Sequence, residues 1–360
     1  MKYAGINLIR ELSLTFGPSG CEDEVRERIL EQIEGECDSY SVDKVGNLIA
    51  VIRGRGLGYD PESPRRIMLS SHMDEVGFMI TAITEEGYLK FSTVGGIDPR
   101  VLCGRHVVVS PYGGKTRLHG VIASKAIHLQ TPEERAKATP IAKMYIDIGA
   151  KNHDDAAKYV SVGDYAAFDS EFVTFGKDSL KMKGKALDDR AGCAMLIEIM
   201  RNLRRNPCDL PFDVYFAFTT CEEIGISGAN VAAFGIAPDI AIILEATAVN
   251  DLPGAGRSFV SKQGEGGTLS MADGGTIYDM GFVNFARQTA EEQGLKCQLK
   301  QACTGGTDAA HIQRTLAGIR VLGLSLPTRY IHSASNVAHV SDYEQIRDLV
   351  IAMLRNWKLD

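Results

Sequence analysis

The amino-acid sequence predicts an α/β fold into which a smaller β-rich domain is inserted. Over most of the chain, helical patterns such as residues 191–203 alternate with short apolar runs such as residues 240–244, and this alternation is typical of α/β proteins. Between residues 75 and 168 the pattern changes to short β-like runs separated by glycine pairs, with sparse helical signal. We therefore expect a discontinuous larger domain, residues 1–74 and 169–360, and an inserted β-barrel-like domain, residues 75–168.

The individual elements follow from periodicity and from turn residues. The run 66–70 is apolar without alternation, as expected of a strand buried on both faces of a sheet. Ser341 to Glu344 has the pattern of a capping box, which would open a final helix ending near residue 354. The other expected helices of the larger domain cover 6–16, 24–33, 191–203, part of 276–293 and 308–314, and its other strands cover 39–42, 48–53, 212–219, 240–244, 297–301 and 319–324. The inserted domain is expected to have strands over 76–83, 88–93, 107–110, 118–123 and 164–168 and short helices within 132–138 and 152–160.

Composition and charge argue against several classes of function. The chain has 360 residues, a formal net charge of −7 and no basic run of the kind that binds nucleic acid. No apolar stretch approaches the roughly 20 residues that a membrane-spanning helix needs. The eight cysteines are scattered without a C-x-x-C pair, so we interpret them as reduced thiols of a cytoplasmic protein.

Polar residues stand where apolar elements of the larger domain end or begin. His72, Glu222-Glu223 and Glu245 follow predicted strands, Asp188 lies at a predicted helix start, and His332 lies in a loop after a strand. In open α/β sheets, the carboxyl ends of the strands are where ligands bind. A lone histidine or an acidic pair is more often a solvated group, but five such positions together indicate a site. Imidazole and carboxylate donors suit zinc, cobalt or manganese rather than calcium.

The spacing of these residues suggests different tasks for them. Adjacent side chains such as Glu222 and Glu223 usually point apart, so one can bind a metal while the other takes a proton from water. Asp188 has a short side chain suited to bridging two metal ions, although Asp188-Asp189 alone would be explained by helix capping. Asp74 could accept the ring N–H of His72 and fix its tautomer, and a solvated loop aspartate explains it equally well.

At these positions the sequence resembles the cytosolic metallo-aminopeptidases of the glutamyl-aminopeptidase and tetrahedral (TET) aminopeptidase family, some of which were once named endoglucanases. The resemblance extends over essentially the whole chain. It implies a three-layer catalytic domain with a central mixed sheet and a site for two divalent metal ions. The matching stretches are His72-Met73-Asp74-Glu75-Val76-Gly77-Phe78, Ala186-Leu187-Asp188-Asp189-Arg190-Ala191-Gly192, Glu222-Glu223-Ile224-Gly225, Gly305-Gly306-Thr307-Asp308-Ala309 and Arg329-Tyr330-Ile331-His332-Ser333.

The resemblance also implies which residues hold the metal ions. Asp188 would bridge the two ions, which are zinc, cobalt or manganese. His72 and Glu245 would complete the protein ligands of one ion, and Glu223 and His332 those of the other. Many members have aspartate where this chain has Glu245, whose longer side chain could bind a metal differently.

The remaining implied roles concern catalysis. Metal-bound hydroxide would attack the N-terminal peptide bond while Glu222 acts as general base and acid, with Asp74 supporting the site. The peptide bond between Asp188 and Asp189 is often cis in this family. Thr307 and Asp308 are candidates for substrate contact, and a helix N-cap explains Asp308 equally well.

The implied partners are peptides with a free N-terminus and further copies of the chain. The family assembles dimers into a tetrahedral dodecamer through the inserted domain, and a simple dimer is the alternative. Two other functions stay open at this point. One is glycoside hydrolysis by the Glu222-Glu223 pair, which would require two carboxyl groups facing each other across a sugar at about 5–9 Å. The other is a non-catalytic scaffold that binds peptides through the β domain.

Overall fold

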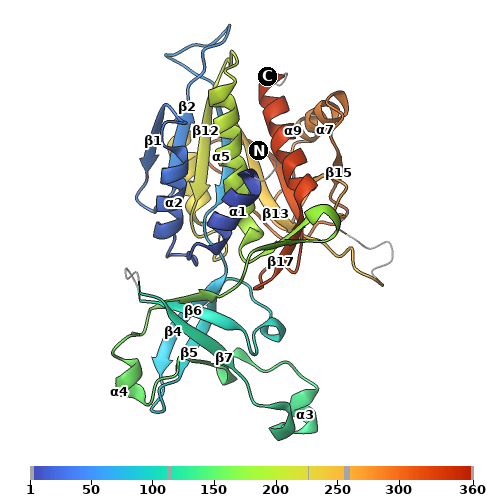
Figure 1. The fold of residues 1–360 in the computed structure, drawn as a ribbon. Helices are drawn as coiled ribbons and strands as arrows, with labels where there is room; N and C mark the ends of the chain where they lie inside the picture. The colour runs from blue at the N-terminus through green and yellow to red at the C-terminus, as the bar shows by residue number, and fades with distance from the viewer. Residues whose placement is uncertain (1–3, 112–115, 226, 255–259, 358–360) are drawn as a thin grey trace.

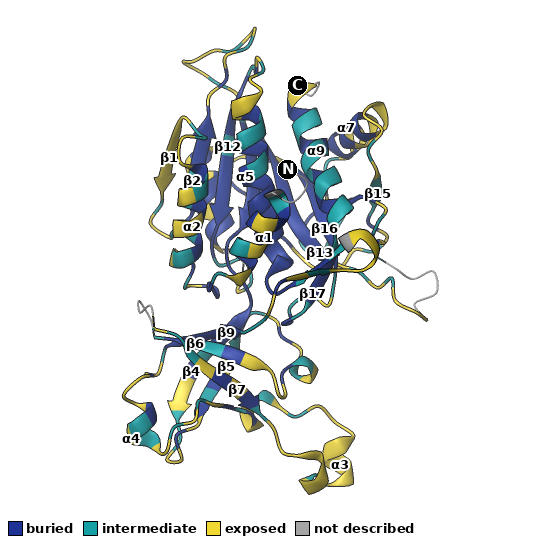
Figure 2. Cartoon of the chain, in the orientation of Figure 1, coloured by how far each residue is buried: buried dark blue, intermediate teal, exposed yellow. Residues whose placement is uncertain are grey.

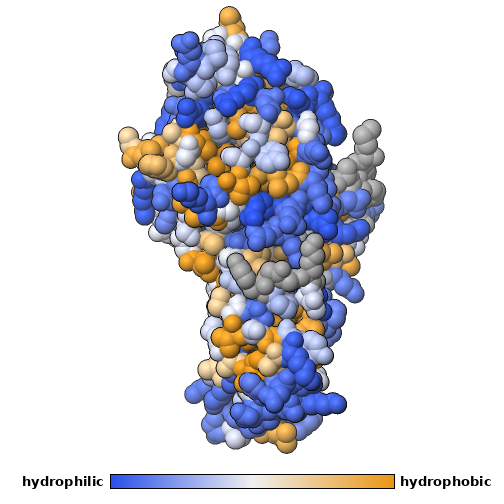
Figure 3. All heavy atoms as spheres, turned by 90° about the vertical axis from the view of Figure 1, so that its left-hand side faces the viewer, coloured by the Kyte–Doolittle hydropathy of each residue, from blue (hydrophilic) through white to orange (hydrophobic). Residues whose placement is uncertain are grey.

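The computed structural model describes residues 4–111, 116–225, 227–254 and 260–357 and shows two parts (Figure 1). The larger part is an α/β domain with a mixed central sheet, and the smaller part is a closed β-barrel. In the space-filling view the larger part is a broad body above the narrower barrel (Figure 3). This architecture confirms the predicted fold class.

The central sheet is built around four parallel strands. β12 (Asp213–Thr219), β3 (Arg66–His72), β13 (Ile240–Ala248) and β16 (Arg320–Arg329) lie side by side in this order, so their carboxyl ends share one edge. β3 is flanked on both sides and its residues are almost all buried, as its unalternating apolar sequence predicts. Antiparallel strands extend the sheet on both sides: β1 (Ser39–Val42), β2 (Leu48–Ile52), β17 (Asn336–His339), β11 (Lys181–Gly184) and β10 (Val173–Phe175), while β14 (Gly267–Leu269) and β15 (Cys297–Leu299) pair beside β16.

Helices cover the sheet in two layers, so the buried core lies between them (Figure 2). α5 (Leu187–Arg205) is buried along most of its length and packs on β3 and β13, with the helices α1 (Ala4–Leu14), α2 (Asp23–Ile33) and α9 (Val340–Arg355) against it. α7 (Met280–Glu292) packs on α9. The second layer contains α6 (Ser227–Ile236) and the short α8 (Ala309–Ile312), which contact each other and the sheet. Within the described residues, no helix is both long and apolar enough to cross a membrane.

The smaller part is a six-stranded barrel with its own core. Phe78 packs edge-on against Phe91 and Phe168 in its interior. Short helices α3 (Pro132–Arg135) and α4 (His153–Ala156) lie outside the barrel. The barrel strands in spatial order are β4 (Gly77–Ile83), β5 (Leu89–Val94), β8 (Tyr145–Asp147), β7 (Leu118–Ala123), β6 (His106–Ser110) and β9 (Tyr165–Phe168).

A small apolar cluster joins the two parts. Phe16, which follows the end of α1, packs with Val94, Tyr165 and Ala167 of the barrel. The Arg117 guanidinium lies 4.6 Å from the centre of the Phe16 ring and pairs with a glutamate of α2. The barrel is therefore fixed against the N-terminal segment of the larger domain.

The structure corrects several predicted element boundaries. Glu245 lies inside β13 rather than after it, because this strand continues, still mostly buried, to Ala248. The capping box at Ser341 is wrong, because the N-cap of α9 is His339, whose Nδ1 accepts a hydrogen bond of 3.2 Å from the Ser341 N–H. Helix α6 and the strands β8, β10, β11, β14 and β17 were not predicted; apart from α6, they are only three or four residues long, too short for a periodic pattern.

Candidate active site

The register of the parallel strands brings the predicted site residues to one edge of the sheet. Thr219 of β12 pairs with His72 of β3, and Ile243 of β13 pairs with Ser70. Glu245 is therefore level with His72 on the neighbouring strand. The start of α5 and the loop between β16 and β17 bring in two further residues, Asp188 and His332.

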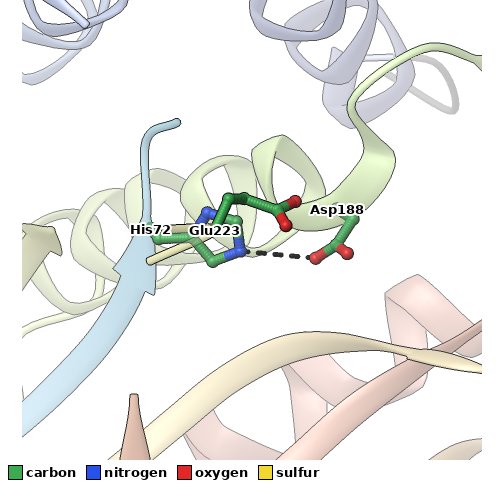
Figure 4. A group of neighbouring side chains, drawn as sticks. All are labelled: His72, Asp188 and Glu223. Carbon is green, nitrogen blue, oxygen red and sulfur yellow. Dashed lines mark ion pairs between the residues drawn. The ribbon is translucent and has the colours of Figure 1, made fainter. Parts of the chain in front are cut away.

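The two oxygens of Asp188 face two different histidines. Asp188 Oδ1 lies 3.3 Å from Nε2 of His72, and Asp188 Oδ2 lies 3.2 Å from Nε2 of His332. Figure 4 shows the His72 ring directed at Asp188, with Glu223 beside them. Each imidazole also faces a glutamate: His72 Nε2 lies 3.2 Å from Glu245 Oε1, and His332 Nε2 lies 3.3 Å from Glu223 Oε2. The five residues thus form two halves, a His72 half and a His332 half, which share Asp188.

Donor atoms in this cluster are close enough to hold a metal ion. One set of ligand atoms within 4.8 Å of each other comes from His72, Asp188 and Glu223, and another comes from His72, Asp189 and Glu245. The sets overlap because the carboxylates surround the same imidazole. We assign the halves by the nearest ring–carboxylate contacts, since the Asp189 carboxylate is already used by hydrogen bonds within the fold.

Both histidine rings are oriented by a backbone carbonyl oxygen. His72 Nδ1 lies 3.1 Å from the carbonyl oxygen of Asp74, and His332 Nδ1 lies 2.7 Å from the carbonyl oxygen of Gly96 in the barrel. Because a carbonyl oxygen only accepts, each ring donates from Nδ1. The Nε2 atom of a neutral ring then presents a lone pair to the carboxylates, an arrangement that is repulsive unless a proton or a metal ion lies between them.

The electrostatics of the cluster are those of a buried acidic site. Burial raises the pKa of Glu223 to about 8 and that of Glu245 to about 8, and Asp188 adds to both rises. Burial also acts to raise the pKa of Asp188, but His332 and His72 outweigh it and lower that pKa. Burial acts to lower the pKa of His332, whereas Asp188 and Glu223 raise it to about 9. Within the described residues, no lysine or arginine pairs with these carboxylates, so only the two imidazoles counter their charge.

Glu222 and Asp74 lie beside the two halves. Burial raises the pKa of Glu222 to about 10, against the opposing charge of His72, and no described residue hydrogen-bonds its carboxylate. Asp74 Oδ1 lies 3.3 Å from His72 Nδ1. Asp74 also accepts hydrogen bonds from the backbone N–H groups of Glu222, at 3.0 Å, and Glu223, at 3.1 Å. Asp74 therefore contacts both His72 and the backbone of the two adjacent glutamates, whereas the sequence indicated only the contact with His72.

The peptide bond between Asp188 and Asp189 is cis, as the family resemblance implied. The Asp189 carboxylate accepts hydrogen bonds from the Ser71 hydroxyl and from the backbone N–H of Gly192, at 3.1 Å, and of His72, at 3.3 Å. A Cβ atom at Gly192 would collide with Asp189 and Ser71, so glycine is required there. Asp189 thereby supports the backbone on which His72 stands.

Thr307 and Asp308 are buried close to the cluster, where the charge of Asp308 acts on His72 and Asp74. Asp308 occupies the N-cap position of α8 but makes no capping hydrogen bond; its Oδ2 accepts from the Thr219 hydroxyl at 2.6 Å. Its Oδ1 is buried and meets no strict hydrogen-bond criterion within the described residues, but the Ser70 hydroxyl, equally buried, interacts with this carboxyl group. The Thr307 hydroxyl lies 3.3 Å from the Tyr278 hydroxyl. Sequence reasoning missed the contributions of Gly96 and of Glu22, which is described below; the glycine pair Gly95-Gly96 was the only visible signal.

Histidine and carboxylate donors that converge at this edge of an α/β sheet are typical of metal-dependent hydrolases. Residues 46–349 match the family model of M42 glutamyl aminopeptidase, and the chain therefore belongs to the M42 family of metallo-aminopeptidases. This result confirms the resemblance seen in the motifs and assigns the chain to the peptide hydrolases.

Solved structures agree with this assignment. The chain is 35% identical to a TET aminopeptidase from the marine sediment archaeon Thaumarchaeota archaeon SCGC AB-539-E09, with a TM-score of 0.91 over 99% of this chain and 98% of that chain. It is 34% identical to the Pyrococcus horikoshii TET1 peptidase, which can assemble into a tetrahedron or a large octahedral shell, with a TM-score of 0.85 over 98% and 100% of the two chains. A structure from Thermotoga maritima, named an endoglucanase, is 31% identical, with a TM-score of 0.76 over 96% of each chain.

Proposed function

We propose that this chain is a two-metal aminopeptidase that removes the N-terminal residue from peptides. His72, Asp188 and Glu245 would hold one divalent ion, and His332, Asp188 and Glu223 the other, with one Asp188 oxygen directed to each. Nitrogen and carboxylate donors in this number suit zinc, cobalt or manganese, so these are the ions that we propose.

The spacing of the donor atoms is the observation that carries this proposal. In both halves, the Nε2 atoms and the carboxylate oxygens lie 3.2 or 3.3 Å apart. Charge-assisted hydrogen bonds between such groups are usually shorter, about 2.7–2.9 Å. Two ligand atoms at about 2.0–2.1 Å from a tetrahedral ion are, by geometry, about 3.3–3.4 Å apart. In each half, the lone pair of the histidine Nε2 atom is directed between that half's carboxylate oxygens. The donor set therefore fits one ion in each half.

The proposed reaction divides its tasks between the metal ions and the residues around them. When bound, the ions would polarise the scissile carbonyl and lower the pKa of the attacking water. The Glu222 carboxylate, which has no hydrogen-bond donor of its own among the described residues, would take a proton from that water and return it to the departing amine. Asp74 would hold His72 and the Glu222 backbone in place. We propose Asp308, with Thr307 beside it, for contact with the bound peptide, because the charge of Asp308 acts on His72 and Asp74 of the site.

We further propose that the chain forms a homo-oligomer, in which dimers built through the inserted barrel assemble into a tetrahedral dodecamer. The assembly of the Pyrococcus horikoshii TET1 peptidase into a tetrahedron supports this proposal. Exposed apolar side chains on the barrel, including Ile127 and Leu129, offer surface for such contacts. We propose a cytoplasmic location, which the eight free cysteines support.

Glycoside hydrolysis is the alternative that the Thermotoga maritima name suggests. It would need two carboxyl groups free to face each other across a sugar. The Glu223 carboxylate instead lies 3.3 Å from Nε2 of His332. Glycoside hydrolysis would also not explain why two histidine rings face the carboxylates. A non-catalytic scaffold is disfavoured because all the expected donor atoms converge.

The test is a panel of aminoacyl chromogenic substrates and a cellulose-derived substrate, assayed on metal-stripped protein. We expect no turnover without metal and recovery of aminoacyl hydrolysis when zinc, cobalt or manganese is returned. Glycosidase activity that persists after metal removal, with no aminoacyl hydrolysis under any metal, would overturn the proposal. Metal stoichiometry, measured in parallel by mass spectrometry, should approach two ions per chain.

A further inference from the structure

The backbone N–H groups of Cys221, Glu222 and Glu223 are consecutive in the sequence, and each of them donates a hydrogen bond to a buried carboxylate. The N–H of Cys221 donates to Glu22 Oε1 at 3.1 Å, and those of Glu222 and Glu223 donate to Asp74 at 3.0 and 3.1 Å. We call this turn, residues 221–223, the glutamate turn. Asp74 and Glu22 come from segments far apart in the sequence, so the turn is held from two directions.

Glu22 does not do what its position in the chain suggests. It is the N-cap residue of α2, yet its side chain makes no capping hydrogen bond. The residue is only 6% exposed, and its carboxylate hydrogen-bonds groups outside the helix. Its Oε1 accepts from the Cys221 N–H and also from the Gly20 N–H, at 2.9 Å. The buried Glu22 carboxylate therefore does not cap α2 but binds the backbone N–H groups of Gly20 and Cys221.

The backbone of the glutamate turn needs such support. Cys221 has a φ of +55°, in the left-handed region, which is unfavourable for a residue with a Cβ atom. Without an acceptor for its N–H, Cys221 is less restrained against relaxing to a negative φ, because Asp74 binds only the next two N–H groups. That rotation would redirect the next side chain, which is Glu222. Successive N–H groups around a left-handed residue form a concave anion-binding site, and here the two carboxylates occupy it.

The segment that carries Glu22 is itself fixed to the site. The Ser19 hydroxyl donates to Asp74 Oδ2 at 2.6 Å, and the Glu75 N–H donates to the Gly17 carbonyl oxygen at 3.0 Å. A Cβ atom at Gly20 would lie 2.9 Å from the Tyr165 hydroxyl of the barrel. Residues 17–22 are therefore confined between β3, the glutamate turn and the barrel.

We infer that Glu22 is a positioning residue for peptide hydrolysis: by accepting the Cys221 N–H, it sets the direction of the Glu222 carboxylate. This inference rests on the proposed function, in which Glu222 transfers the proton. The ligand Glu223 is held independently by Asp74 and by its contact with His332. Loss of Glu22 should therefore reduce proton transfer and leave the metal ions bound.

The test compares Glu22→Ala with Glu22→Gln in the full-length, metal-loaded protein. A single oxygen of Glu22 accepts both N–H groups, so the amide oxygen of glutamine can replace it. We expect Glu22→Ala to lower kcat roughly 10- to 100-fold, with KM within about threefold of wild type and two metal ions retained. Glu22→Gln should keep kcat within about threefold of wild type. Because Glu22→Ala is at risk of misfolding, Glu22→Asp provides a second variant, whose shorter side chain should lower kcat by about tenfold while metal content stays constant.

Asp213→Ala is the matched control. Asp213 is also a buried carboxylate that accepts a backbone N–H, from Gly54 at 2.9 Å, but it lies at the opposite end of β12. This variant should lower the unfolding temperature without changing kcat. Normal kcat in Glu22→Ala, equal losses in Glu22→Ala and Glu22→Gln, or a loss of kcat that parallels lost metal would overturn the inference alone. An inactive, metal-loaded wild type would overturn the proposed function and this inference together.

Discussion

The two halves of the candidate site are built from the same kinds of side chain but supported very differently. In the His72 half, histidine and glutamate stand level on neighbouring parallel strands, and their side chains are 1% and 5% exposed. In the His332 half, the histidine comes from a loop and its side chain is 33% exposed. A barrel carbonyl, that of Gly96, orients the His332 ring. Apart from Asp188, which both halves share, the first half belongs to the sheet, whereas the second is completed where the two domains meet.

This difference has consequences for metal binding. Strand pairing fixes the His72 half before any metal arrives, so little conformational entropy is lost on binding. The His332 half depends on the Gly95-Gly96 loop of the barrel and is more open to water. We therefore expect a tightly held ion in the His72 half and a weaker, more readily exchanged ion in the His332 half.

Replacing the residue that the halves share should have the largest effect. Asp188→Ala removes one donor from each half, so we expect both ions to be lost and aminoacyl hydrolysis to fall by at least roughly 10⁴-fold. Asp239→Ala is the control, because Asp239 lies near the opposite end of the parallel strands, where its carboxylate accepts the Arg66 N–H at 2.8 Å. Two ions bound to Asp188→Ala would show that the halves do not share this residue.

Glu222→Gln should separate catalysis from metal binding in both halves. Because Glu222 faces neither imidazole, the variant should keep two ions and lose proton transfer, lowering kcat by roughly 10²–10⁴-fold. Glu223→Gln, one residue along the same turn, should instead lose the ion of the His332 half. Turnover close to that of wild type in Glu222→Gln would refute its role as the base.

Stepwise metal removal should distinguish the halves directly. On titration with a chelator, we expect wild type to release its ions in two steps separated by about tenfold or more in affinity, the His332 half first. His332→Ala should show only the tight step, and His72→Ala should lose that step. Simultaneous release of both ions from wild type would contradict the asymmetry.

The sequence predicts the His72 half better than the His332 half, for a physical reason. A polar residue that ends or interrupts a buried apolar strand is visible as a break in pattern, as at His72 and Glu245. Parallel pairing then brings such residues together without further information. For Glu245 the strand continues past the break, so the predicted end of β13 was wrong, although Glu245 does lie level with His72.

The supporting contacts could not be predicted, because they leave no periodic signal. The Gly96 carbonyl reaches His332 across 236 positions of sequence, and a backbone atom carries no residue identity. Glu22 follows a loop and begins a helix, where an acidic residue is ordinary. Both contacts depend on how the barrel and the N-terminal segment pack, which is a tertiary property.

The smallest expected effect tests the dependence of the His332 half on the barrel. Gly95 has a φ of +83°, and a Cβ atom there would lie 2.8 Å from Val76 Cγ1 and 3.3 Å from Glu223 Cβ. Gly95→Ala should therefore shift the loop that carries the Gly96 carbonyl and press on Glu223. We expect the affinity for the ion of the His332 half to fall about 10- to 100-fold, as for other losses of a contact that orients a metal ligand, with the His72 half unchanged.

Gly104→Ala separates this effect from backbone strain. Gly104 lies in the same barrel with a φ of +77°, but a Cβ atom there would meet nothing within 4 Å. Both substitutions carry the cost of a left-handed alanine, about 1–2 kcal/mol of unfolding free energy. Only Gly95→Ala should change the chelator titration. If both variants released metal as wild type does, the barrel would not influence metal binding in the His332 half. Any difference in metal affinity between the two halves would then have to come from the greater exposure of the His332 half.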